Sequence, residues 1–205
     1  MSGDLLTLVV IGGALLLGAM SPGPSFLLVA RTAVASSRRA GLLVSAGMGL
    51  GSFLFAIVAL AGLHTVLTLV PSLYVTLKVA GGCYLLWLAL NMFRPGKTSS
   101  ADLTQAAPVS AYKAFGIGVI TQISNPHTAL VFASIFTATL SAHISLSMTI
   151  ALPIMAFVID AGWYVVVALA LSTERPRRIY MKYRRFIDKT SGAIMATLGV
   201  RLLLR

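Results

Sequence analysis

Long apolar runs that are almost free of charge dominate this chain and limit what it can fold into. A helix needs about 20 residues to cross the hydrocarbon core of a bilayer. Six runs approach that length, and they cover residues 5–30, 40–63, 72–93, 114–138, 146–171 and 186–204. Only 10% of the 205 residues are charged, whereas soluble domains average about a quarter. We therefore expect an all-α polytopic membrane protein with six transmembrane helices.

Two of these runs contain a proline break. Ser21-Pro22-Gly23-Pro24 interrupts the first run, and Asn125-Pro126 interrupts the fourth. Inside a membrane, the backbone groups that a break frees must be received by protein or by a wet cavity. Matched broken helices in the two halves of a membrane protein indicate a substrate site near the middle of the bilayer. A packing kink is the alternative, because Pro and Gly are common in membrane helices.

The position of the breaks predicts an internal repeat. With three spans in each half, the halves insert in opposite orientations, and the two breaks meet across a pseudo-two-fold axis in the membrane plane. We expect one transmembrane domain, 1–205, made of a first repeat at 1–93, a cytoplasmic linker at 94–113 and a second repeat at 114–205. Broken helices expose amide ends that suit a carboxylate and carbonyl ends that suit an ammonium group.

The net charge of +11 is unevenly distributed. Most of the Lys and Arg residues lie in or beside the loops after the first, third and fifth runs, and the loops between contain none. By the positive-inside rule those three loops are cytoplasmic and both termini face outward. The basic cluster between Arg175 and Lys189 suits anionic lipids at the cytoplasmic face. Nucleic acid is not expected as a partner, because no groove-reading fold accompanies the charge.

Several segments, in order along the chain, resemble one known family. They are Ser21-Pro22-Gly23-Pro24, Arg38-Arg39-Ala40-Gly41 with Gly47, Gly49 and Gly51, then Leu77 to Leu85, Phe115 to Gly118, Asn125-Pro126, Phe186 to Gly192 and Leu198-Gly199. These segments resemble the lysine exporter (LysE/RhtB) family of amino acid efflux transporters, of the homoserine/threonine exporter type. The resemblance implies proton-driven export of amino acids or their derivatives across the bacterial inner membrane, with no cofactor. The family usually has a lysine after Asn-Pro, where this chain has His127.

Asp160 is the deepest ionisable residue of the predicted spans. A charged and unpaired aspartate at that depth costs several kcal/mol, and charges inside membranes are functional by default. We expect Asp160 to couple protons or to bind the substrate ammonium, with a structural ion pair to a residue such as Lys78 as the alternative. Lys78 itself is a candidate for proton coupling, although its place near the outer end of its span also suits snorkelling.

The predicted substrate-binding residues surround the breaks and Asp160: Pro22, Gly23, Pro24, Gln122, Asn125, Pro126, His127 and Tyr164. His127 follows the second break and titrates near neutral pH in its ordinary state. Tyr164 lies one helical turn after Asp160 and is expected on the same face. Hydrogen bonding between helices is the alternative for the polar members. With one membrane carboxylate, and a histidine in place of the usual lysine, we favour neutral, threonine-like or homoserine-like substrates over dibasic ones.

The glycines of the second run form small-xxx-small pairs. Gly47 with Gly51, and Gly41 with Ser45 and Gly49, allow close helix packing on more than one face. We expect packing within one chain, with homodimerisation through the same faces as the alternative.

Two other classes of membrane protein compete with a transporter. A membrane enzyme is disfavoured because only one membrane carboxylate is present and no nucleophile–base pair is evident. The three histidines lack the spacing of metal ligands, and the single Cys83 excludes an internal disulfide. A passive channel would carry flux without ever accumulating substrate against its gradient.

Overall fold

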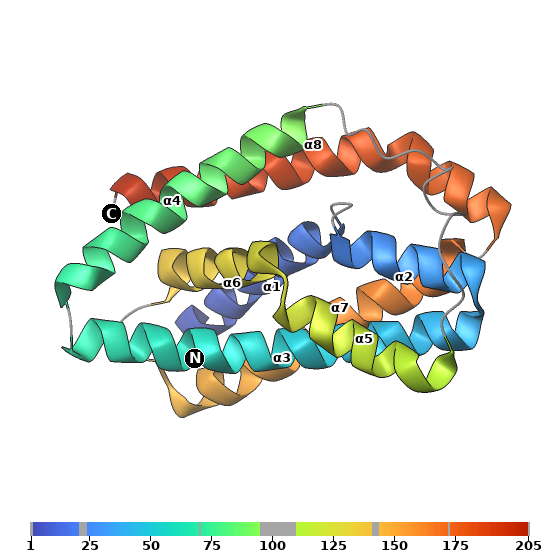
Figure 1. The fold of residues 1–205 in the computed structure, drawn as a ribbon. Helices are drawn as coiled ribbons and strands as arrows, with labels where there is room; N and C mark the ends of the chain where they lie inside the picture. Colours follow the sequence, from blue (N-terminus) through green and yellow to red (C-terminus); the bar gives the residue numbers. More distant parts are fainter. Residues whose placement is uncertain are drawn as a thin grey trace.

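A computed structural model gives the fold of the chain and describes residues 2–20, 24–69, 71–94, 110–140, 144–171 and 173–204 (Figure 1). The described residues form eight helices and no strand, so the all-α class is confirmed for them. The helices are α1 (Ser2–Met20), α2 (Pro24–Ala35), α3 (Arg38–Leu69), α4 (Pro71–Phe93), α5 (Ala111–Ile123), α6 (Pro126–Thr139), α7 (Leu146–Leu171) and α8 (Glu174–Leu204).

The second break is present as predicted, between α5 and α6. Asn125 leaves the helical conformation, with φ −85° and ψ 105°, and Pro126 takes the first position of α6. The side chain of Asn125 then caps α6, because its Oδ1 accepts a hydrogen bond from the backbone N–H of His127 at 3.0 Å. Proline suits that first position, where its missing N–H has no helical partner to lose.

At the first break, α1 and α2 meet at an angle of 53°. Residues 21–23, with most of the predicted Ser-Pro-Gly-Pro motif, lie outside the described residues. Pro24 is the first residue of α2.

Four helix bounds refine the predicted spans. α7 coincides with the run 146–171, and α4 begins one residue before the run 72–93. α3 extends beyond 40–63 at both ends. The largest difference is α8, which begins at Glu174 rather than near residue 186. The basic cluster predicted to form a loop is therefore helical, because Arg, Lys and Met all favour helices.

The described helices fit a membrane protein by length and composition. α3 over Arg38–Leu63 and α7 over Leu146–Ala170 are long and apolar enough to cross a membrane, and the bent pair α1–α2 is a third candidate when counted as one span. In α4 the apolar stretch Lys78–Phe93 is shorter. The full set of six spans therefore stays a prediction.

α3 and α7 form the centre of the structure. α3 packs along α7 and α5, whereas α4 pairs with α8 in a separate layer (Figure 1). Close approach depends on glycines: a Cβ at Gly47 would lie 2.2 Å from the carbonyl oxygen of Phe115, and one at Gly49 would lie 2.6 Å from Cβ of Ala161. The two small-residue faces of α3 therefore pack on two neighbours within the same chain, as predicted.

The apolar core has two parts along α3 and α7. One cluster includes Ala56 and Leu60 of α3 with Leu152 and Ala156 of α7. The other includes Val44 and Met48 of α3 with Tyr164 and Ala168 of α7. Because the two helices run antiparallel (Figure 1), Ser52 and Asp160 lie between the two clusters. A polar layer thus separates two apolar layers at the middle of the central helix pair.

We predict that Gly47→Ala destabilises the protein whereas Gly62→Ala, on the same helix, does not. The new methyl group at position 47 would collide with the backbone of α5, while nothing lies within 4 Å of a Cβ at Gly62. Overpacking of this kind costs roughly 1–3 kcal/mol, which corresponds to a loss of several degrees in the melting temperature. Thermal unfolding in detergent measures both variants. Equal melting temperatures would show that α3 and α5 are not held at this distance.

Candidate functional site

The carboxylate of Asp160 lies in the polar layer and is bonded only by neutral groups. Its Oδ2 accepts hydrogen bonds from the hydroxyl of Ser52 and, at 3.0 Å, from the amide Nε2 of Gln122. Asp160 is 6% exposed and Gln122 is 1% exposed. Within the described part of the chain, no lysine or arginine pairs with Asp160. The alternative prediction, a structural ion pair between Asp160 and Lys78, is therefore wrong for the described residues.

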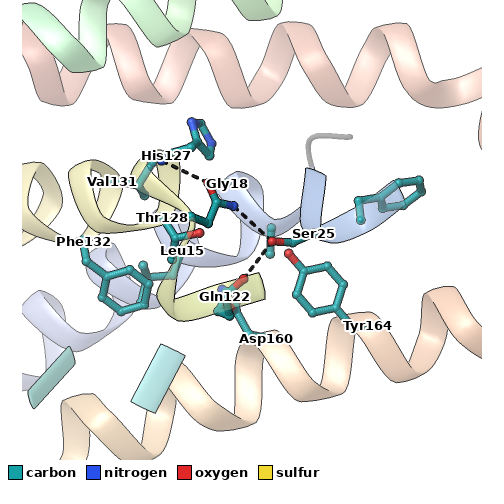
Figure 2. Close-up of a pocket in the computed structure, with 13 residues that line it drawn as sticks. Leu15, Gly18, Ser25, Gln122, His127, Thr128, Val131, Phe132, Asp160 and Tyr164 are labelled. Atoms are coloured by element: carbon teal, nitrogen blue, oxygen red, sulfur yellow. Dashed lines mark hydrogen bonds between the residues drawn. The ribbon is translucent and has the colours of Figure 1, made fainter. Parts of the chain in front are cut away.

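Gln122 connects Asp160 to the two broken helices. Its Nε2 also donates to Ser52 Oγ at 2.7 Å, and its Oε1 accepts from Ser25 Oγ at 2.7 Å. Ser25 in turn accepts from Nδ2 of Asn125 at 3.2 Å. One hydrogen-bond network therefore joins α2, α3, α5, α7 and the break before α6, as Figure 2 shows in part.

A small, partly open cavity of about 40 Å³ adjoins this network (Figure 2). Its polar wall is formed by Ser25, Gln122, Asn125, His127, Thr128, Asp160 and Tyr164, and its apolar wall by Leu15, Gly18, Ala19, Phe26, Val131 and Phe132. One water molecule needs about 10–15 Å³ of such cavity volume, so the cavity has room for a few waters. We call it the central cavity.

His127 follows the cap residue Asn125 but directs its ring away from Asp160 (Figure 2). Its Nδ1 shares a hydrogen bond of 2.8 Å with the hydroxyl of Tyr84 on α4. The ring centroid of Tyr84 lies 5.6 Å from that of Trp87, which helps to hold the tyrosine in place. His127 therefore links the second broken helix to the α4–α8 layer.

Five of the predicted site residues come together at the central cavity: Gln122, Asn125, His127, Asp160 and Tyr164. Figure 2 shows Tyr164 pointing from α7 towards Ser25. Pro126 is exposed and does not line the cavity, Pro22 and Gly23 lie outside the described residues, and only the backbone of Pro24 is described. Lys78 is half-buried on α4 and is not part of the cavity lining.

Four polar residues at or near the site were not predicted. Ser25 and Ser52 belong to the network, Thr128 lines the cavity, and Tyr84 bonds His127. The sequence carried a signal for two of them, because Ser25 directly follows the first break and Thr128 lies in the first turn after the second. Ser52 lies among glycines and small residues, and Tyr84 is one of several aromatic residues in its run, so neither stands out.

A second and larger cavity, of about 250 Å³, lies between α3, α4 and α6. Its lining is mostly apolar, with residues such as Leu63, Ala80, Leu130 and Ala133. Its polar lining residues are Tyr84, Ser134 and Thr137, and none of them is charged. Charged ligands need convergent polar groups, and these gather at the central cavity despite its smaller size.

A helical membrane protein with a polar site between two broken helices has the features of a transporter. The chain matches the family described as LysE type translocator over residues 16–205. It therefore belongs to the LysE type translocator family.

Individual relatives cover nearly the whole chain. An uncharacterized membrane protein of Escherichia coli, YahN, is 35% identical over 188 residues, which cover 89% of this chain and 82% of the relative. The threonine efflux protein of Escherichia coli is 29% identical, and that of Salmonella typhi is 30% identical; each comparison covers 90% of this chain and 91% of the relative. No solved structure matches the chain.

We predict that Tyr84→Phe lowers the melting temperature by a few degrees. The substitution keeps the ring but leaves Nδ1 of His127 without its bond to Tyr84, and a lost hydrogen bond costs about 0.5–1.5 kcal/mol. Tyr112→Phe is the control, because Tyr112 is 98% exposed. Thermal unfolding in detergent compares the two, and an unchanged melting temperature for Tyr84→Phe would show that the bond to His127 does not form.

Proposed function

We propose that this protein exports small neutral amino acids, threonine-like or homoserine-like, from the bacterial cytoplasm in exchange for protons. The observation that carries the proposal is Asp160, a buried carboxylate with only neutral described partners, beside a cavity where two broken helices meet. Membership of a translocator family and relatives named as threonine efflux proteins support it.

An amino acid zwitterion suits the two kinds of groups at this cavity. α2 and α6 both begin at its edge, near Ser25 and Asn125, and helix N-termini attract carboxylates through their free amides and dipoles. Asp160 lies across the network and offers a negative charge to the ammonium group. We assign carboxylate binding to the two helix starts and ammonium binding to Asp160.

Asp160 also provides a means of coupling to protons. An isolated carboxylate taken out of water is strongly destabilised, so a closed cavity requires Asp160 to hold either a proton or a cation. The ammonium group of the substrate and a proton then compete for the same oxygen atoms. If each excludes the other, the site carries the substrate one way and a proton the other, which is antiport.

The size of the central cavity requires it to change during transport. About 40 Å³ holds a few waters but not an amino acid. The broken helices are the elements suited to move, because their backbone is already interrupted. On the side of α6, Phe132 lines the cavity and lies 6.3 Å from Phe55 and 5.7 Å from Phe136 between ring centroids. We assign closure of the outward path to these three aromatic rings.

The proposed topology has six spans in two inverted repeats, 1–93 and 114–205, joined by the cytoplasmic linker 94–113. The pairing of α3 with α7, and of α4 with α8, supports it, because corresponding helices of two repeats meet at a two-fold axis. Both termini then face outward across the inner membrane. The exposed Lys182, Arg185 and Lys189 of α8 suit anionic lipids at the cytoplasmic side.

Transport by the purified protein in sealed vesicles tests the proposal. With an imposed proton gradient, a panel of labelled neutral, basic and acidic amino acids is compared with protein-free vesicles. Accumulation of neutral amino acids against their own gradient is expected. Flux that only equilibrates would indicate a passive channel, and turnover of substrate in detergent would indicate an enzyme.

We predict that Asp160→Asn abolishes accumulation driven by the proton gradient. Losing the charged partner of the ammonium group alone is worth about 1.5–3 kcal/mol, or about tenfold or more in affinity. Asp4→Asn is the control, because Asp4 is exposed at the start of α1 and accepts only from Ser145 among the described residues. Full gradient-driven export by Asp160→Asn would rule out the role of Asp160 in coupling.

A further inference from the structure

We propose that Thr128 selects the side chain of the substrate by hydrogen bonding to a hydroxyl group on it. The inference rests on the proposed function and deepens it: the favoured substrates are short amino acids with a side-chain hydroxyl. Thr128 would then distinguish threonine from valine, which has the same shape but a methyl group in place of the hydroxyl.

The hydroxyl of Thr128 has no partner within the described residues, although the side chain is only 7% exposed. It is nevertheless not sealed among apolar atoms, because Thr128 lines the central cavity (Figure 2). Water in the cavity can bond this hydroxyl, and a ligand that displaces the water must replace that bond. A hydroxyl group on the ligand would do so.

Other buried threonines of this chain satisfy their hydroxyl groups locally. Thr32 donates to the carbonyl of Leu28 at 2.8 Å, and Thr137 donates to that of Ala133 at 2.7 Å. Each uses a helical carbonyl four residues earlier. For Thr128 that residue is Ser124, which lies before the break, where Asn125 is extended. The break therefore removes the local acceptor and leaves the hydroxyl available to the cavity.

The two walls of the cavity define what kind of side chain Thr128 meets. The charged ends of an amino acid belong near Ser25, Asn125 and Asp160, so its side chain extends along the apolar wall. Thr128 lies between Phe132 and Ser25 in the view of Figure 2, with an apolar residue on one side and a polar residue on the other. A hydroxyl on the β or γ carbon of a substrate would reach it.

The apolar wall also sets a size limit. Gly18 leaves space beside the cavity, because a Cβ there would lie 3.7 Å from Cε of Met195 and 3.9 Å from Cγ1 of Val131, both ordinary contacts. A cavity that has to widen for its substrate needs less rearrangement of this wall for a short side chain than for a long one. Substrate selection then combines a small space with one hydrogen-bonding group.

Competition between threonine and valine in sealed vesicles tests the inference. Wild-type protein is expected to transport threonine at least about tenfold more efficiently than valine, since a site that bonds a hydroxyl leaves its own group unpaired with the analogue. Thr128→Val should reduce that preference about tenfold. Thr128→Ser should keep it. Thr137→Val is the control, because Thr137 does not line the central cavity. The preference of this variant for threonine over valine should equal that of the wild type.

Stability provides an independent readout. Because the hydroxyl of Thr128 makes no bond within the described chain, Thr128→Val should melt at or above the wild-type temperature. Unchanged discrimination in Thr128→Val, an equal loss of both substrates, or a melting temperature below that of the wild type would each overturn the inference. If wild-type protein transports neither threonine nor valine nor any other amino acid, the proposed function fails as well, which is a different result.

Discussion

The carboxylate of Asp160, buried among neutral hydrogen-bond donors, is the constraint on which the surrounding structure depends. Two donors, Ser52 and Gln122, come from two different helices that must approach α7 and each other closely. Gly51 makes this possible, because a Cβ there would lie 2.5 Å from Cβ of Gln122. The glycine pattern of α3 and the polar layer are therefore parts of one arrangement, in which small residues bring the donors within reach of the acid.

The two apolar clusters on either side of the polar layer determine which part of the protein can rearrange most readily. Each cluster joins helices from both halves of the chain. Packed protein interiors have low compressibility and transmit strain. The polar layer between them is held by hydrogen bonds among Ser52, Gln122 and Asp160 instead. Rearrangement at the middle of the protein is therefore less costly than rearrangement within either cluster.

Sequence patterns predicted where most helices lie along the chain, but not which face of each helix points towards the cavity. The apolar runs located α7 and α4 to within one residue, and the second break fell where Asn-Pro indicated. Asp160, Gln122 and Asn125 were found because polar groups are rare in such runs. Ser25, Ser52 and Thr128 were missed, since a serine or threonine is neutral in a helix until its face is known. Lys78 was included for its charge inside a span and for the family resemblance of its segment, but it does not line the cavity.

The second break explains why these separate features occur at one place. An uninterrupted fourth helix would satisfy its own amides and would offer Thr128 a carbonyl one turn earlier, as the helices around Thr32 and Thr137 do. The break exposes the start of α6 and frees the hydroxyl of Thr128. It also sets Asn125 free to bond Ser25 of the other broken helix. An interruption of the backbone by two residues thus supplies the amide end, the hydroxyl of Thr128 and the contact between the halves, all at the cavity that Asp160 also lines.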